Sequence, residues 1–129
     1  MSEQFDSSRP IYAQLVERLK ARILAGTYQP GGHLDSVRDL AAAAGVNPNT
    51  MQRALAELER EQLVFSQRTA GRFVTEDSEM IQTIKQELAQ QQLAQFFQAM
   101  AKLGYARAEI VALVEQSGSK EAQDGDSGM

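Results

Sequence analysis

The sequence lacks cysteine entirely and contains a single histidine, His33, among its 129 residues. Without cysteine there is no disulfide framework and no thiolate metal site. His33 follows two glycines in a turn-rich segment, and a metal site needs several ligands, so we expect a solvated surface side chain there. The sequence also has no glycine-rich phosphate loop and no motif that places a nucleophile beside the histidine. We therefore expect neither an enzyme nor a bound metal or cofactor.

Long apolar segments are absent as well. No run approaches the roughly 18 apolar residues of a membrane-spanning helix, and the N-terminus has no apolar signal-peptide core. Hydrophobic residues make up 43% of the chain, which is typical of a globular protein. We therefore expect a soluble, cytoplasmic protein with one domain, or a small domain plus an appendage.

The sequence also lacks the excess of positive charge that marks a strong nucleic-acid binder, since its formal net charge is −4. The charge is unevenly distributed along the chain. Residues 1–76 hold nine basic and nine acidic side chains, whereas residues 77–129 hold four and eight, which accounts for the whole −4. A neutral N-terminal module with local basic groups can still bind DNA, with modest non-specific affinity.

Residues 36–62 have the pattern of two short helices joined by a tight turn. Ser36 can cap the first helix, and Gly45 can end it in a left-handed conformation. Asn47 can cap the second helix, with Pro48 at its first position, where a missing N–H is harmless. Each helix carries an apolar stripe, formed by Val37, Leu40, Ala41 and Ala44 in the first and by Met51, Leu55 and Leu58 in the second. The pattern predicts a helix-turn-helix.

Four polar side chains gather near the start of the second helix: Asn49, Thr50, Gln52 and Arg53. Amides, hydroxyls and guanidinium groups are the ones that read base edges and contact phosphates in DNA. The first half of a recognition helix is where such residues touch bases. For Arg53, an ion pair with Glu57 four residues on is the alternative to a phosphate contact. The pattern favours a helix that reads DNA.

A further helix is expected before this segment, from about Pro10 to Gly26, with residues 1–8 as a short flexible arm. Proline favours the opening position of a helix, and glycine is a natural stop. The apolar stripe of this helix steps by four residues: Ile11, Leu15, Leu19 and Ile23. One face of the helix is therefore expected to pack in the core.

A β-hairpin is expected after the second of the two short helices. Residues 63–66 and 72–75 carry side chains that favour strands, and the polar QRTAG between them contains a glycine. Leu34 is also placed to pair briefly as a small strand. Three helices followed by a hairpin make a winged helix-turn-helix over residues 9–76, with the wing tip at residues 68–72.

Residues 77–116 are expected to form two helices, one from about 79 to 103 with Ser78 as its cap, and one over 106–115. The long helix carries two apolar seams on different faces: Ile81, Ile84 and Leu88 in the first, and Leu93, Phe96, Phe97, Met100 and Leu103 in the second. We expect the first seam to dock on the winged domain and the second to pack in a dimer. An effector pocket lined by the second seam is the alternative. Residues 117–129 form a low-complexity tail that we expect to be disordered.

Several family-specific segments follow one another along the N-terminal part: PIY at the first helix, PGG-x-L-x-SVRDLA, VNPNT, RALAELE and a closing G-x-FV. In these motifs the segment resembles the DNA-binding domain of GntR-family bacterial transcription regulators. The short helical region that follows is similar to that of the YtrA subfamily, whose members resemble dimeric repressors often encoded beside ABC transporter genes. The resemblance implies a mainly α fold, in which a winged helix-turn-helix is followed by a two-helix dimerisation appendage.

The resemblance also implies a set of DNA contacts in this sequence: Arg38, Asn47, Asn49, Thr50, Gln52 and Gly71. Arg53 adjoins these positions and is expected to contact a phosphate. Arg72 stands where the family commonly has threonine, and we expect it to add a phosphate or minor-groove contact. Two other departures, Asp35 for a proline and Gln62 for a glycine, are expected to lower stability a little.

The function implied is that of a homodimeric repressor that binds double-stranded DNA at a palindromic operator, with transporter genes as candidate targets. A small-molecule effector could bind at the dimer junction, or the C-terminal region could serve only to dimerise. The alternative function is a winged-helix protein-interaction module without sequence-specific DNA binding, which the net negative charge would suit.

Overall fold

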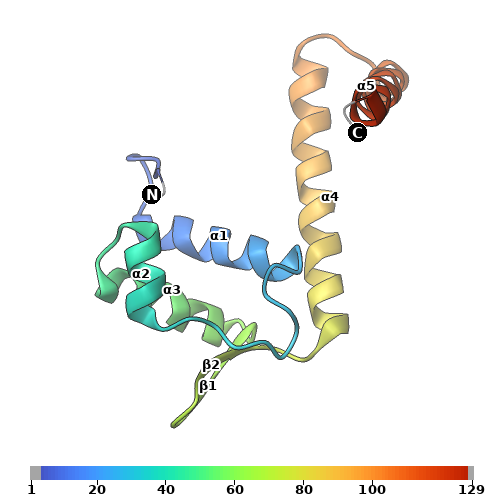
Figure 1. Cartoon of the computed structure of the whole chain (residues 1–129). Coiled ribbons are helices and arrows are strands. Elements are labelled where there is room, and N and C mark those ends of the chain that lie inside the picture. The colour runs from blue at the N-terminus through green and yellow to red at the C-terminus, as the bar shows by residue number, and fades with distance from the viewer. Residues whose placement is uncertain (1–3, 128–129) are drawn as a thin grey trace. The chain divides into compact units, whose positions relative to one another are not determined.

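The computed structural model describes residues 4–127, with side chains described as far as residue 118. Its elements, in chain order, are α1 (Ile11–Leu24), α2 (Val37–Ala44), α3 (Pro48–Arg60), β1 (Val64–Gln67), β2 (Gly71–Val74), α4 (Ser78–Lys102) and α5 (Arg107–Ser127) (Figure 1). The chain divides into two compact units, Met1–Lys85 and Gln86–Met129, which we call the first and second units. The predicted class, three helices and a hairpin followed by two helices, is confirmed.

The first unit is built around one hydrophobic core. Leu55 and Leu58 of α3 lie at its centre with no exposed surface. Buried side chains surround them from the other elements of the unit: Leu15, Leu19 and Ile23 of α1, Leu40 and Ala44 of α2, and Val64 and Val74 of the hairpin. Ile81, at the start of α4, is buried in the same core, and Ile84 packs against it. The predicted docking of the first seam of α4 is therefore confirmed for these two residues, whereas Leu88 belongs to the second unit.

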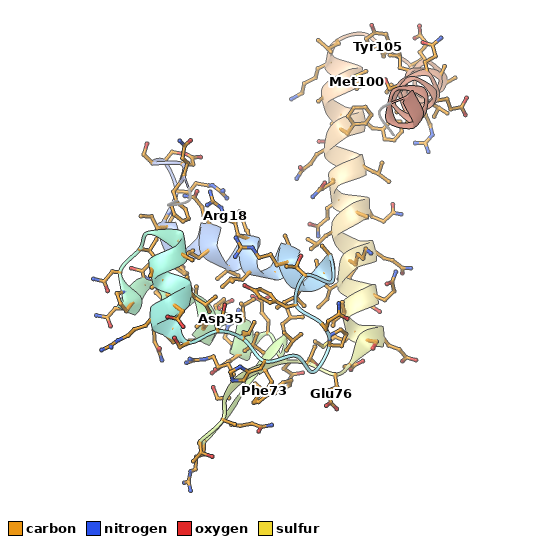
Figure 2. All side chains as sticks on the ribbon, in the orientation of Figure 1. Arg18, Asp35, Phe73, Glu76, Met100 and Tyr105 are labelled. Atoms are coloured by element: carbon orange, nitrogen blue, oxygen red, sulfur yellow. The ribbon has the colours of Figure 1, made fainter. Side chains whose placement is uncertain are left out.

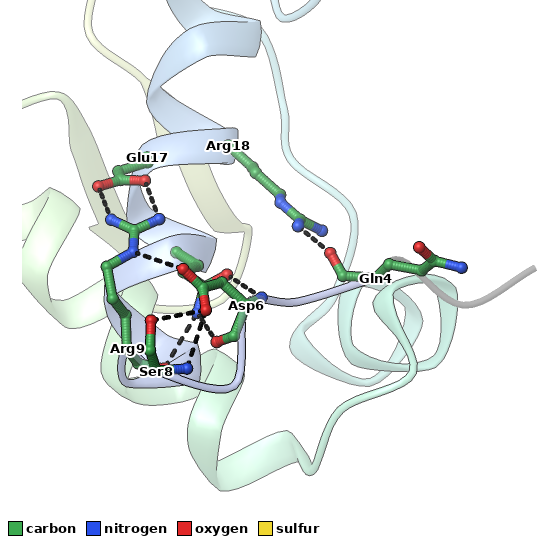
Figure 3. Close-up of polar contacts among 7 residues, drawn as sticks. Gln4, Asp6, Ser8, Arg9, Glu17 and Arg18 are labelled. Atoms are coloured by element: carbon green, nitrogen blue, oxygen red, sulfur yellow. Dashed lines mark hydrogen bonds and ion pairs between the residues drawn. The ribbon is translucent and has the colours of Figure 1, made fainter.

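The N-terminal segment differs from the prediction of a flexible arm. The Asp6 N–H donates to Gln14 Oε1 (2.8 Å), and Gln14 Nε2 donates to the carbonyl oxygens of Asp6 (2.7 Å) and Arg9 (3.0 Å) (Figure 3). Phe5 packs against the core with the Arg18 guanidinium 4.1 Å from its ring centroid. Residues 4–8 are thus held on α1, and residues 1–3 lie outside the described chain.

This docking explains why the buried face of α1 is rotated from the predicted one. Ile11, predicted to begin the apolar stripe, is 44% exposed, whereas the polar Gln14 is buried. Burial of an amide is favourable only when its donors and acceptor are satisfied, and the backbone of the N-terminal segment supplies the partners of Gln14.

The predicted helix ends of the helix-turn-helix are confirmed. Ser36 Oγ accepts the N–H of Asp39 at the start of α2 (3.1 Å), and Gly45 ends that helix with φ 72°. Asn47 Oδ1 accepts the N–H of Asn49 (2.8 Å), with Pro48 at the first position of α3. These local interactions fix where α2 stops and α3 starts, and so set the direction of α3.

The ends of the last two helices differ from the predictions. The cap of α4 is Asp77, whose carboxylate accepts the N–H of Met80 (3.0 Å), while Ser78 already lies in the first turn. Carboxylates suit a helix N-terminus because they complement its partial positive charge. The last helix does not stop at residue 115 before a disordered tail, since α5 continues to Ser127. No proline interrupts this stretch, and Lys120, Glu121 and Ala122 favour a helix, although Gly118 and Gly125 do not.

The wing is a hairpin whose second strand is paired on both edges. β1 and β2 are antiparallel, with Phe65 opposite Phe73. On the other edge of β2, the Leu34 N–H donates to the Arg72 carbonyl oxygen (2.9 Å), and the Val74 N–H donates to that of Gly32 (2.9 Å). Leu34 pairs through its N–H as predicted, but it lies in no strand, since the bridged residue is His33 in an isolated bridge to Phe73. The segment before α2 fixes the base of the wing.

The second unit consists of the later part of α4 and α5, joined by a turn at Gly104, which has φ 99°. Figure 2 labels Met100 and Tyr105 on the two sides of this turn. Ile110 is the one buried hydrophobic residue among the described side chains of the unit. None of the helices between residues 4 and 127 combines the length and the hydropathy needed to cross a lipid bilayer.

Candidate DNA interface

The exposed surface of the helix-turn-helix is formed by the first half of α3 and one face of α2. Asn47, Asn49 and Gln52 are exposed near the N-terminus of α3, and Thr50 is half-buried beside them. Arg38 is exposed on α2. The buried stripe of Met51, Leu55 and Leu58 holds the opposite face of α3 against the core, so the polar face must point outward.

The three amides on this surface differ in what they can still bind. Asn47 uses its carbonyl oxygen as the helix cap, so only its NH₂ group remains to donate outward. The side-chain amides of Asn49 and Gln52 form no hydrogen bond within the part of the chain that is described, so each retains both a donor and an acceptor. A free amide of this kind can make two hydrogen bonds to one base edge.

Arg53 does not form the ion pair with Glu57 that was the alternative to a phosphate contact. Its guanidinium lies over the ring of Tyr12 in α1, with 3.7 Å between the guanidinium carbon and the ring centroid. Glu57, the predicted ion-pair partner, instead accepts from Arg60 (Nε–Oε2 2.9 Å), which lowers the pKa of Glu57. A guanidinium stacked on a ring keeps its N–H groups at the edge, where they can donate to a phosphate. Tyr12 was not foreseen as part of this surface.

The two predicted DNA contacts of the wing, Gly71 and Arg72, lie in different surroundings. Gly71, in the hairpin, has φ 88°, a conformation that favours glycine. Arg72 turns toward α3, where its Nε lies 2.8 Å from Glu59 Oε1, and its side chain is only 19% exposed. The Ser66 hydroxyl donates to the same carboxylate oxygen. The guanidinium predicted to contact DNA is therefore engaged within the protein.

His33 is exposed, as predicted, but its ring has partners. Its Nε2 lies 2.7 Å from the Ala70 carbonyl oxygen, and its ring packs edge-on against Phe73 with 4.9 Å between centroids. Figure 2 labels Phe73 at the wing, where this contact forms. A Cβ added at Gly71 would lie 3.0 Å from His33 Nε2, so a larger residue there would also have to displace the His33 ring. The described residues contain no His, Asp or Glu cluster able to hold a metal ion.

The residues predicted to form a dimer core lie in the second unit. Leu93, Phe96 and Leu103 are exposed, by 48%, 40% and 73% respectively. Phe97 and Met100 are half-buried. Phe96 and Phe97 contact each other edge-to-face, and the guanidinium of Arg107 in α5 lies 4.9 Å from the centroid of Phe97. Val111 and Val114 of α5 are also exposed, so apolar surface occurs on both helices of the unit.

Comparison with known proteins gives this surface a context. Residues 11–74 match the family of bacterial regulatory proteins named gntR. An uncharacterized HTH-type transcriptional regulator of Bacillus subtilis, YhcF, is 37% identical over 86% of this chain and 92% of its own length. The B. subtilis HTH-type transcriptional repressor YtrA is 42% identical over 56% of this chain and 55% of its own length.

Two solved structures extend the comparison. A GntR family transcriptional regulator from Listeria monocytogenes has a TM-score of 0.81 and 41% identity, covering 87% of this chain and 98% of that one. AraR(DBD) in complex with operator ORR3 has a TM-score of 0.51 and 27% identity, covering 58% of this chain and 88% of that one. The likeness to the Listeria regulator extends into the second unit of this chain. The likeness to AraR(DBD) covers little more than the length of a winged helix-turn-helix.

Proposed function

Because the chain belongs to the gntR family of bacterial regulatory proteins, and is therefore a transcription regulator rather than an enzyme, we propose that it is a homodimeric repressor. It binds a palindromic operator in the cytoplasm, with one recognition helix in each half-site. The observation that carries the proposal is the exposed amide surface at the start of α3, on a helix whose opposite face is fixed in the core. The resemblance to YtrA-type regulators extends the proposal to transporter genes as targets.

The proposal assigns base reading to Asn49, Thr50 and Gln52. An amide pairs bidentately with the N6 and N7 edge of adenine, and such a pair gives about 1–3 kcal/mol of discrimination. Gln52, like Asn49, is exposed and free of internal hydrogen bonds; we assign this contact to Gln52 and expect it to select adenine. Asn47 can add a donor contact beside it.

Contacts to the DNA backbone are assigned to Arg38, Arg53 and the backbone at Gly71. Phosphate contacts fix the register of the protein on the duplex and carry no sequence information directly. The stack on Tyr12 holds Arg53 at the edge of the α3 surface, which suits a contact that positions the helix.

The second unit supplies the dimer contact in this proposal. Its support is the exposed apolar surface around Leu93, Phe96 and Leu103, with Phe97 and Met100 beside them. Large exposed apolar patches mark interaction sites, and two identical winged units must be joined to read a palindrome. The junction of the two copies is the place proposed for a small-molecule effector.

The test is selection of bound sequences from a random duplex pool, with the purified protein at a stated salt concentration. The proposal expects enrichment of an inverted repeat with half-site centres about 10 bp, or a multiple of that, apart. Binding without sequence enrichment, seen only at low salt, would contradict it and would favour a protein-interaction module.

Two variants on one helix sharpen the test. Gln52→Ala should relax selection at one base pair per half-site. Arg53→Ala should instead weaken binding to all sequences alike and lower the slope of log K against log salt by about one. Equal weakening of every sequence by Gln52→Ala would show that Gln52 does not read a base.

A further inference from the structure

The wing contains two arginines in very different surroundings. Arg68 lies in the turn between β1 and β2, is exposed, and forms no ion pair or hydrogen bond within the described residues. Arg72, on β2, is largely covered and is bonded to Glu59 of α3. The two side chains carry the same charge, but only one of them is available to a ligand.

Glu59 ties both strands of the wing to the recognition helix. Its Oε1 accepts from Arg72 Nε of β2 at 2.8 Å and from the Ser66 hydroxyl of β1. If Arg72 moved away to bind DNA, the Glu59 carboxylate would keep the Ser66 hydroxyl but lose the cation bonded to it. A lone carboxylate close to phosphates is unfavourable because like charges repel. Glu59 therefore opposes the transfer of Arg72 to DNA.

The other side of the wing is held by the segment before α2. Leu34 and Gly32 bond to the backbone of β2, and His33 Nε2 lies 2.7 Å from the carbonyl oxygen of Ala70. Contacts on both sides fix the base of the hairpin, so that the turn beyond it is presented in one place. A preorganised element loses less entropy on binding.

We propose that the two wing arginines have separate roles: Arg68 contacts operator DNA, and Arg72 is a positioning residue that holds the wing on α3 through Glu59. This inference rests on the proposed DNA-binding function. The ligand of Arg68 is the anionic duplex, either a phosphate or the negative potential of a narrow A·T-rich minor groove. It reassigns the wing contact from Arg72 to Arg68.

The first experiment measures the affinity of the full chain for its selected operator over a range of salt concentrations. Arg68→Ala should weaken binding about fivefold near 0.15 M salt and lower the slope of log K against log salt by about 0.9, as expected for one lost phosphate contact. Arg68→Lys, which keeps the charge, should retain the slope. Arg72→Ala should weaken binding without lowering the slope. A slope lowered by Arg72→Ala and unchanged by Arg68→Ala would overturn the proposal.

Glu59→Gln should change DNA affinity in opposite directions, depending on whether Glu59 acts through its charge alone or by positioning the wing. If Glu59 acted only through its charge, its neutralisation near DNA would strengthen binding. Because it positions the wing, we expect weaker binding, and Glu59→Gln combined with Arg72→Ala should be little worse than either change alone. Tighter binding by Glu59→Gln would contradict the positioning role.

Operator variants show whether Arg68 contacts a phosphate or the minor groove. Duplexes with an A·T run or a G·C run at the wing position are compared with the wild-type protein and Arg68→Ala. Preference for the A·T run that disappears in Arg68→Ala indicates the minor groove, and equal affinities indicate a phosphate.

Hydrogen exchange of the free protein tests Arg72 without DNA. Amides of β1 and β2 should exchange faster in Arg72→Ala and Glu59→Gln, and at the wild-type rate in Arg68→Ala. Unchanged exchange in all three variants would overturn the role of Arg72. If the wild-type protein bound no operator, the proposed function and the role of Arg68 would fail together, while this measurement would still decide the role of Arg72.

Discussion

The two units of this chain use apolar residues in opposite ways. In the first unit, the large apolar side chains of the helices other than Ile11 are buried or half-buried by the chain itself, around a centre at Leu55 and Leu58. In the second, Ile110 is buried but Leu93, Phe96 and Leu103 face outward. The contrast occurs within one helix, since Ile81 of α4 is 8% exposed and Leu93 is 48% exposed.

In our proposal, this difference separates the residues that fold the first unit from those that join two copies of the chain. Burial of apolar surface is favourable wherever it occurs, so exposed apolar residues on two helices indicate a surface that another molecule covers. In the first unit, the large apolar side chains left exposed are Ile11 of α1 and Phe65 of β1, which lie on different elements. We therefore assign DNA reading to the first unit and propose dimerisation for the second.

The largest effect is expected from a cavity in the core of the first unit. Leu55→Ala removes a fully buried side chain, which should lower the free energy of unfolding by about 2–5 kcal/mol. Chemical denaturation followed by circular dichroism measures the change. Leu93→Ala, the same substitution on an exposed position, should leave the unfolding of the first unit unchanged. Equal losses from the two variants would mean that the units do not differ as described.

The second prediction concerns the exposed surface of α4. Leu93→Ser combined with Phe96→Ser should convert the dimer to a monomer and weaken binding to a two-half-site operator by at least about 100-fold, because linked half-sites gain avidity of 10²–10⁴. Sedimentation and fluorescence anisotropy measure the two effects. Gln92→Ser with Gln95→Ser has the same spacing on the same helix and should change neither. A variant that remains dimeric would place the interface elsewhere.

A smaller effect is expected at the end of α3, where Gln62 has φ 66°. The N–H groups of Gln62 and Leu63 bond back to the carbonyls of Glu59 and Leu58, as in a Schellman motif that glycine usually completes. Gln62→Gly should therefore stabilise the first unit by about 1 kcal/mol. Gly45→Ala, at the equivalent position after α2, should destabilise it. Thermal unfolding measures both, and a loss of stability with Gln62→Gly would contradict the explanation. The oligomeric state should be unaffected.

The smallest effect is expected at the exposed pair of Arg9 and Glu17 (Nη1–Oε1 2.8 Å). The hydrogen bond from Arg9 lowers the pKa of Glu17 below its ordinary value of 4.5. The pair therefore contributes stability above that value, and the contribution is lost as the pH falls through the lowered pKa. Arg9→Gln should slightly reduce stability at neutral pH and make no difference in strong acid. A loss of stability from Arg9→Gln that became larger as the pH fell would contradict this explanation.

The sequence was sufficient where structure is determined locally. Ser36, Gly45 and Asn47 were placed correctly because caps and left-handed turns depend on residues within a few positions. The buried stripes of α2 and α3 followed from helical periodicity alone.

Periodicity failed at α1, where Gln14 is buried and Ile11 is exposed, because the N-terminal segment folds back to satisfy the amide. The bonding partners of Arg72 and His33 were not predicted from the sequence, for a related reason. Arg72 meets Glu59 across 13 positions, and His33 meets Ala70 across 37, so both pairs depend on tertiary structure. Residue type predicted charged or polar groups at these places but could not predict which of them would be bonded within the protein.

The most direct test of the account is the mass of the complex between the full chain and its selected operator, measured by native mass spectrometry or sedimentation. We predict two copies of the chain on one inverted-repeat duplex, and the same two copies in the absence of DNA. With Leu93→Ser and Phe96→Ser, the free protein should have the mass of one copy. A single copy bound tightly and specifically to the duplex would contradict the central claim that the second unit exists to join two DNA-reading units.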